Sequence, residues 1–270
     1  MNTAIETNTA TIVEPTTEPA LQLEHVSYSY SKGGKRVLID KNYDFRAGSV
    51  VSITGPSGAG KTTLLSLLSG LTTPTKGRVL HNGEDLAKAD RYRFRSHGIG
   101  VIFQSFNLLP ALTVAENIIL SVDASGKTFD RPKKQIATEL IEKVRLQPEY
   151  LNERILHLSD GEQQRVSIAR ALSYNPQIIL ADEPTGNLDL ATQDDIMGIF
   201  KDLAHAEGKC VIIVTHSPEV AAQSDEVFQL APLRERQRWH CIDADRSGYE
   251  CHQQTSSLRR PPYELRMTDN

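Results

Sequence analysis

The chain has 270 residues, of which 39% are hydrophobic and 24% charged, and its formal net charge is −4. This size and composition fit one large globular domain or two small ones, and the charge gives no electrostatic reason to expect nucleic acid as a partner. No apolar run approaches the roughly 18 residues of a membrane span, and residues 1–20 do not resemble a secretory signal. Three cysteines suggest no disulfide framework and are consistent with a reducing cytoplasm.

Both ends of the chain differ in composition from the middle. Residues 1–20 are rich in Thr, Glu, Ala and Pro and contain no base, so we expect a disordered tail there. After Leu230 the apolar pattern ends, and residues 233–270 are predicted to form a second poorly ordered tail, which leaves 21–232 as the folded domain. The second tail contains potential zinc ligands, but their spacing matches no recognised zinc finger and we expect no metal there; they are His240, Cys241, Cys251 and His252.

The first predicted elements lead into a glycine-rich turn. Residues 21–26 alternate apolar and polar side chains, which predicts a half-exposed strand. Residues 50–54 are predicted to form a buried strand, and apolar residues at helical spacing predict a helix over 61–71, with Gly70 near its end.

The later elements alternate between helix and strand. Helices are predicted over 136–146 and 162–174, the second ending before Pro176, and apolar β-branched runs predict buried parallel strands over 177–181 and 211–215. Alternating strands and helices indicate an α/β sheet with right-handed crossovers.

Residues 55–62, with the sequence GPSGAGKT, match the phosphate-loop pattern G-x-x-x-x-G-K-[ST]. Glycines let backbone N–H groups wrap a phosphate chain, and the N-terminus of the following helix adds a positive end. Lys61 is then expected to reach the β- and γ-phosphates and Thr62 to ligate Mg²⁺. A chance glycine-rich turn is the alternative, but the position between a predicted strand and a predicted helix favours the phosphate loop.

The predicted strand over 177–181 leads into two carboxylates. Ligands collect at the carboxyl edge of a parallel sheet, so we expect Asp182 to hold Mg²⁺ through water and Glu183 to orient or deprotonate the attacking water. Acids at a strand end are often merely solvated, and it is the preceding loop that favours the catalytic interpretation.

Further motifs identify a family resemblance. Residues 158–166 (LSDGEQQRV) look like the signature motif of ABC ATPases, 101–106 (VIFQSF) resemble their Q-loop, 186–189 (GNLD) their D-loop, and 214–216 (VTH) their switch histidine. The resemblance covers about residues 21–230. Residues 100–117 and 181–189 look most like the branch that serves lipoprotein release, macrolide export and antimicrobial-peptide resistance.

This resemblance implies a P-loop core with a parallel sheet, an antiparallel β subdomain and an inserted α-helical subdomain at about 105–160. It also implies that Tyr30 stacks on adenine, that Gln104 senses the γ-phosphate and Mg²⁺, and that His216 contacts the γ-phosphate. The implied ATP-binding residues are Tyr30, Gly55, Pro56, Ser57, Gly58, Ala59, Gly60, Lys61, Thr62, Thr63 and Gln104; the implied catalytic residues are Lys61, Glu183 and His216; and the implied Mg²⁺ ligands are Thr62, Gln104 and Asp182.

Taken singly, several of these residues have ordinary structural interpretations. Gln104 fits a surface polar residue, His216 a hydrogen-bonded structural histidine, and Tyr30 a strand aromatic packed on a neighbour. The segment from Leu158 to Gly161 fits an ordinary capped helix start. Only the ordered set of motifs supports the functional roles.

The resemblance further implies that the signature residues Ser159, Asp160, Gly161 and Glu162 contact the ATP of a second subunit, and it assigns Asp189 to the D-loop. A second anion site is physically reasonable at a helix N-terminus carrying a serine hydroxyl. One departure concerns Asp160, because the commonest signature has glycine at this position. Its carboxylate would lie near the expected γ-phosphate.

The expected function is an ATPase subunit that uses Mg-ATP, forms a dimer that we expect to be a homodimer, and powers export through integral-membrane permease subunits. It would lie in the cytoplasm, on the inner face of the cell membrane, with no nucleic acid bound. A mechanotransmission complex without transmembrane cargo is the close alternative. An ABC ATPase of DNA repair or chromosome structure would need a long coiled coil or zinc insertion before the signature, and a nucleotide kinase would not explain the signature.

Overall fold

The structure, a computed structural model, describes residues 19–31, 34 and 36–231. The two tails predicted for 1–20 and 233–270 lie outside this range except for residues 19 and 20, and so do the potential zinc ligands. In the described part, no helix combines the length and the apolar character that crossing a membrane requires.

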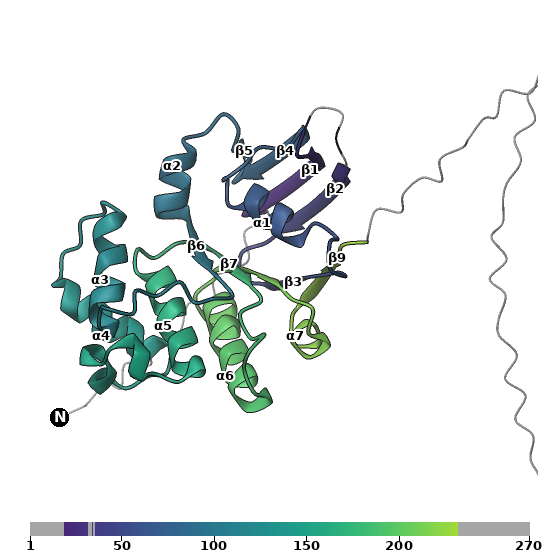
Figure 1. Cartoon of the computed structure of the whole chain (residues 1–270). Coiled ribbons are helices and arrows are strands. Elements are labelled where there is room, and N and C mark those ends of the chain that lie inside the picture. The colour runs from purple at the N-terminus through teal and green to yellow at the C-terminus, as the bar shows by residue number, and fades with distance from the viewer. Residues whose placement is uncertain (1–18, 32–33, 35, 232–270) are drawn as a thin grey trace, which may run out of the picture. The chain divides into compact units, whose positions relative to one another are not determined.

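A five-stranded parallel sheet carries the predicted buried strands. The strands lie in the order β6-β7-β8-β3-β9 (Figure 1), and their bounds are β3 Val50–Thr54, β6 Ile99–Ile102, β7 Ile178–Asp182, β8 Cys210–Val214 and β9 Glu226–Gln229. Every residue of β8 is buried, because both faces of the sheet are covered. The predicted α/β sheet is therefore confirmed.

The second sheet is antiparallel, with the order β2-β1-β4-β5 and the bounds β1 Leu21–Ser29, β2 Arg36–Phe45, β4 Lys76–His81 and β5 Glu84–Asp85. The strand predicted over 21–26 continues to Ser29. Its alternating burial breaks at His25, whose φ is 51°, and the pairing register shifts there. This bulge restores inward-facing positions further along the strand.

The helices are α1 Lys61–Leu68, α2 Arg91–Arg93, α3 Val114–Ala124, α4 Lys133–Lys143, α5 Asp160–Leu172, α6 Leu190–Lys201 and α7 Pro218–Ala222. Shorter helical turns are η1 Phe94–Gly98, η2 Pro148–Asn152, η3 Ile155–His157 and η4 Asp202–Ala206. In Figure 1, α3, α4 and α5 group together beside the parallel sheet.

Three predicted helices have different ends in the structure. The helix predicted over 61–71 ends at Leu68, because Gly70 takes a left-handed φ of 68° and closes the last turn. The helix predicted over 136–146 is α4, which begins right after Pro132. The helix predicted over 162–174 begins at Asp160, because Ser159 is its N-cap.

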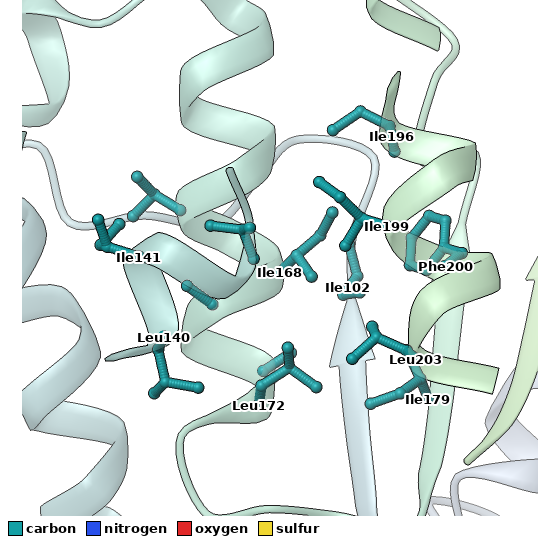
Figure 2. Packing of buried hydrophobic residues seen from close by; sticks show 14 of the residues in the cluster. Ile102, Leu140, Ile141, Ile168, Leu172, Ile179, Ile196, Ile199, Phe200 and Leu203 are labelled. Carbon is teal, nitrogen blue, oxygen red and sulfur yellow. The ribbon is translucent and has the colours of Figure 1, made fainter. Parts of the chain in front are cut away.

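Two apolar cores lie on opposite faces of the parallel sheet. Along β7, Ile179 and Ala181 belong to one core, whereas Ile178 and Leu180 belong to the other. The first core joins the sheet to α3–α6: Figure 2 shows Ile102 and Ile179 of the sheet beside side chains from α4, α5 and α6. The second core fills the space between the sheet, α1 and the antiparallel sheet. Burying a single isoleucine contributes about 1.5–3 kcal/mol, so these cores fix the carboxyl ends of β3, β7 and β8 at one edge.

Candidate active site

The phosphate loop joins β3 to α1 at that edge. Gly60 has φ of 96°, and a Cβ there would lie 3.0 Å from side-chain carbons of both Val37 and Leu38. Gly55 has φ of 154°, and a Cβ there would lie 2.6 Å from the carbonyl oxygen of Leu230. The loop therefore needs glycine at both positions for backbone conformation and for close packing.

The loop has the features of an anion site. The Lys61 ammonium donates to the carbonyl oxygens of Gly55 at 2.7 Å and Pro56 at 3.3 Å, so it arches back over the loop. No side chain caps α1, and its first turn contains no acidic residue. The N–H groups at this helix start therefore remain available to a phosphate, which the helix dipole also favours.

Asp182 and Glu183 follow β7 directly, as predicted. Burial and the neighbouring Glu183 raise the pKa of Asp182 above its usual value, while Lys61 opposes this shift. A carboxyl group with a raised pKa is costly to ionise, and a nearby cation offsets this cost. The raised pKa of Asp182 is therefore compatible with a role near Mg²⁺.

Glu183 and His216 form a hydrogen-bonded pair. His216 Nδ1 lies 2.7 Å from Glu183 Oε1, and the His216 backbone N–H donates to Glu183 Oε2 at 3.3 Å. Glu183 has a positive φ of 48°, and its own N–H donates to the Val214 carbonyl of the adjacent strand. The glutamate is 11% exposed and the histidine 69% exposed. The strained backbone thus holds a nearly buried carboxylate against an accessible imidazole.

Gln104 also lies at this edge. A Cβ on Gly186 would be 3.7 Å from Gln104 Nε2 and 3.9 Å from the Glu183 side chain, so the three residues are neighbours. The expected Mg²⁺ ligands supply hydroxyl, amide and carboxylate oxygens, which are the donors that Mg²⁺ prefers. No group of three or more His, Cys, Asp or Glu side chains suited to a metal occurs among the described residues.

Tyr30 lies at the end of β1 with 74% of its surface exposed. Its hydroxyl is 2.8 Å from Oγ1 of Thr63, in the first turn of α1, and Tyr28 packs against it edge-on. The ring is therefore anchored beside the phosphate loop, an arrangement compatible with stacking on a base.

The signature motif forms the start of α5. Ser159 and Glu162 make a capping box: the Ser159 backbone N–H and hydroxyl each donate to Glu162 Oε2 at 2.8 Å, and Glu162 N–H donates to the serine hydroxyl at 3.4 Å. Hydrogen bonds from Tyr150 and Ser159 lower the pKa of Glu162. Asp160 is exposed. In the described part of the chain, no hydrogen bond joins Ser159 to residues 55–62.

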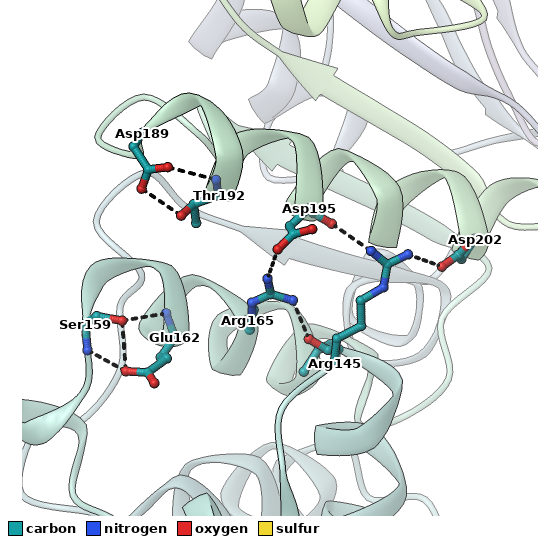
Figure 3. Close-up of polar contacts among 9 residues, drawn as sticks. Arg145, Ser159, Glu162, Arg165, Asp189, Thr192, Asp195 and Asp202 are labelled. Atoms are coloured by element: carbon teal, nitrogen blue, oxygen red, sulfur yellow. Dashed lines mark hydrogen bonds and ion pairs between the residues drawn. The ribbon is translucent and has the colours of Figure 1, made fainter.

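The D-loop contacts the signature through a residue that the sequence did not single out. Asp189 caps α6 by accepting from the Thr192 backbone N–H at 3.0 Å and its hydroxyl at 2.7 Å (Figure 3). A Cβ on Gly161 would lie 2.7 Å from Cγ2 of the same threonine. Thr192 therefore fits closely between the two motifs.

Two arginines also join α6 and η4 to α5 and to the residues that follow α4 (Figure 3). Arg165, 11% exposed, donates to the Val144 carbonyl at 3.0 Å and to Asp195 at 2.9 Å. Arg145 pairs with Asp202 at 2.7 Å. Both contacts are long-range, and no local pattern in the sequence indicates them.

The sequence of this chain is similar to a known protein family. A family model described as ABC transporter matches residues 38–186. The chain is 40% identical over 211 residues to the ABC transporter ATP-binding protein YclH of Bacillus subtilis, covering 78% of this chain and 93% of YclH.

Solved structures show the same likeness. The dimeric structure of the cassette MJ0796, from Methanocaldococcus jannaschii, has a TM-score of 0.70 at 37% identity and covers 78% of this chain and 94% of its own. A post-hydrolysis state of MJ0796 bound to ADP and Pi matches with a TM-score of 0.70 at 36% identity, over 80% and 97% of the two chains. The cbiO1 protein of Clostridium perfringens, part of the transporter complex cbiONQ, has a TM-score of 0.70 at 25% identity, over 79% and 85%.

Proposed function

The chain belongs to the ABC transporter family as an ATP-binding subunit that hydrolyses ATP, and from this premise we propose that nucleotide-driven dimerisation lets it power a membrane export or extrusion complex. The observation that carries the hydrolytic part of the proposal is the Glu183–His216 pair, which follows the carboxyl ends of β7 and β8. It supplies a proton acceptor and an exposed imidazole at the edge where Lys61 arches over the anion site.

In this proposal each group at the site has one task. Lys61 and the backbone of residues 55–60 neutralise and orient the β- and γ-phosphates. Glu183 accepts the proton of the attacking water, and His216 fixes the carboxylate and contacts the γ-phosphate. Thr62, Gln104 and Asp182 would hold Mg²⁺, which neutralises charge on the phosphates.

Dimerisation supplies the signature to the partner's nucleotide. Ser159, Asp160, Gly161 and Glu162 stand at the N-terminus of α5, whose dipole favours an anion, yet no hydrogen bond joins Ser159 to the phosphate loop of its own chain in the described structure. Two chains placed head to tail would satisfy both anion sites. The solved MJ0796 cassette is a dimer, which supports pairing of two such chains.

In this proposal, membrane-embedded subunits complete the transporter. The cbiO1 relative belongs to a transporter complex, and we propose that permease subunits hold this chain at the inner face of the cell membrane. Exposed apolar side chains next to Gln104 and on α3 suit such docking: Phe103, Leu109 and Leu120 are 40%, 45% and 48% exposed. The motif sequences of residues 100–117 and 181–189 favour the branch of lipoprotein release and macrolide export.

The test of the hydrolytic roles is ATP turnover by purified variants. Lys61→Ala should lose ATP affinity, whereas Glu183→Gln should retain ATP binding and lose turnover, because only proton acceptance is removed. Normal turnover by Glu183→Gln would remove Glu183 from the mechanism.

A further inference from the structure

The turn that follows Gln104 has an unusual backbone. Phe106 and Asn107 both have positive φ, 58° and 53°. Asparagine tolerates the left-handed region, but a bulky aromatic residue there is a conformational outlier. Such a conformation persists only where the surrounding structure imposes it, and it is frequent at functional sites.

Local hydrogen bonds account for only part of this turn. The Phe106 N–H donates to the Phe103 carbonyl at 3.1 Å, and the Ser105 hydroxyl donates to the Asn107 side chain at 2.9 Å. These bonds close the turn directly after Gln104. They leave the carbonyl groups of Phe106 and Asn107 pointing toward another element.

That element is the signature helix α5. Arg170 donates from Nη2 to the Phe106 carbonyl at 3.0 Å and from Nη1 to the Asn107 carbonyl. Burial lowers the pKa of Arg170, and the nearby Tyr174 opposes this shift. The planar guanidinium fork therefore binds two successive carbonyls of the left-handed turn.

A residue just beyond α5 holds the other end of the strand that leads to Gln104. The Tyr174 hydroxyl, just beyond α5, donates to the carbonyl of Ile99 at 2.8 Å. Ile99 is the first residue of β6, and Gln104 follows the end of this strand. Arg170 on α5 and Tyr174 just beyond it therefore hold the backbone after and before Gln104.

We propose that Arg170 is a positioning residue for Gln104. By holding Phe106 and Asn107 in the left-handed conformation, it sets the direction of the Gln104 side chain toward Gly186 and Glu183. The proposal rests on the proposed role of Gln104 at Mg²⁺ and the γ-phosphate. It also gives Gln104 a mechanical link to the partner's nucleotide, because Arg170 and Ser159 lie on one rigid helix about 16 Å apart.

A purely structural role for Arg170 predicts different behaviour. If the arginine only stabilised the fold, its loss would lower Tm without a selective effect on the Mg²⁺ dependence of ATP hydrolysis, and Phe106→Gly would change Tm without restoring any Mg²⁺ affinity. If it imposes the left-handed turn, then Phe106→Gly should compensate for its loss, because glycine adopts this conformation without strain.

The experiment measures ATP hydrolysis by the purified full chain against Mg²⁺ concentration. The variants are Arg170→Gln, Arg170→Lys, Phe106→Gly and the double variant Arg170→Gln/Phe106→Gly. Arg170→Gln should lower kcat roughly 10- to 100-fold, in the range expected from misplacing a reacting group, and raise the half-maximal Mg²⁺ concentration. Its Kd for ATP without Mg²⁺ should change less than about twofold, because the phosphate loop is untouched.

Rescue decides between the two roles. The double variant should recover most of the lost kcat and Mg²⁺ affinity, and Arg170→Lys should recover less, because an ammonium cannot form the fork. The matched control is Arg131→Gln, which removes a half-exposed arginine paired with Glu139 and should leave kcat and Mg²⁺ dependence unchanged. A double variant no better than Arg170→Gln would overturn the proposal.

Gln104→Ala separates this inference from the proposed function. If Gln104→Ala raises the Mg²⁺ requirement but Arg170→Gln does not, the positioning role is wrong and the role of Gln104 stands. If Gln104→Ala leaves the Mg²⁺ dependence unchanged, the role of Gln104 is wrong and the inference falls with it.

Discussion

Replacing Gly161 with alanine tests how closely the signature helix approaches the helix that follows the D-loop. A Cβ at this position would lie 2.7 Å from Cγ2 of Thr192, so one of the two groups must move. Thr192 is not free to rotate, because its hydroxyl and backbone N–H both donate to Asp189, at 2.7 and 3.0 Å. The added methyl group should therefore disrupt the N-cap of α6.

Two contributions to stability nearly cancel in this variant. Loss of an aspartate N-cap costs about 1 kcal/mol, whereas glycine to alanine within a helix gains about 0.5–1 kcal/mol. One kcal/mol changes the Tm of a domain of this size by about 2–4 °C. We expect Gly161→Ala to change Tm by less than about 4 °C while ATPase activity falls, because Asp189 loses its fixed position at the proposed subunit interface.

A second substitution makes this reasoning testable. Thr192→Ser removes Cγ2 and keeps the hydroxyl that caps Asp189. ATPase activity and Tm should be measured for Gly161→Ala, Thr192→Ser and the double variant. The double variant should recover the activity of Thr192→Ser and exceed its Tm through the gain in helix propensity. If it is as inactive as Gly161→Ala, Gly161 is required by the partner's nucleotide and the steric argument is refuted.

Three further predictions concern charge and domain boundaries. Asp160→Asn should strengthen ATP-driven dimerisation in sedimentation experiments, because it removes the repulsion between the carboxylate and the γ-phosphate; weaker dimerisation would contradict this repulsion. The same variant should lower Tm slightly, because a carboxylate at the start of α5 contributes about 0.3–1 kcal/mol to stability. Burial raises the pKa of Asp182, so its ionisation destabilises the fold increasingly as pH rises from its unfolded to its folded pKa. Asp182→Asn should therefore raise the Tm of the nucleotide-free protein at neutral pH, with the difference vanishing in acid, and an unchanged Tm would refute this. A chain shortened to residues 21–232 should bind ATP with unchanged affinity by calorimetry, and loss of binding would show that the predicted tails contribute to the site.

The parallel sheet and its edge could be predicted from the sequence because their signals are local. Buried strands are apolar runs, and the phosphate loop is contiguous from Gly55 to Thr62, so its position between β3 and α1 follows directly. The antiparallel sheet is harder to predict from the sequence, because buried and exposed residues do not alternate regularly along β2 and the bulge at His25 interrupts β1. For α3, the capping box of Thr113 and Glu116 is a local signal that marks the start of the helix.

The contacts between motifs were not predictable because they depend on tertiary packing. Arg170 and Asn107 are 63 positions apart, and neither belongs to a periodic pattern that links them. The approach of Thr192 to Gly161 depends on the relative placement of α5 and α6. The left-handed backbone at Phe106 and Glu183 is likewise set by surrounding structure, since neither residue type favours it.

The most direct test of the central claim is the mass of Glu183→Gln in solution, measured by light scattering after size exclusion. The account predicts a monomer without nucleotide or with ADP, and a dimer with Mg-ATP, because only the γ-phosphate joins the phosphate loop of one chain to the signature of the other. A dimer of the same mass under all three conditions, or a monomer at saturating Mg-ATP, would contradict nucleotide-driven dimerisation.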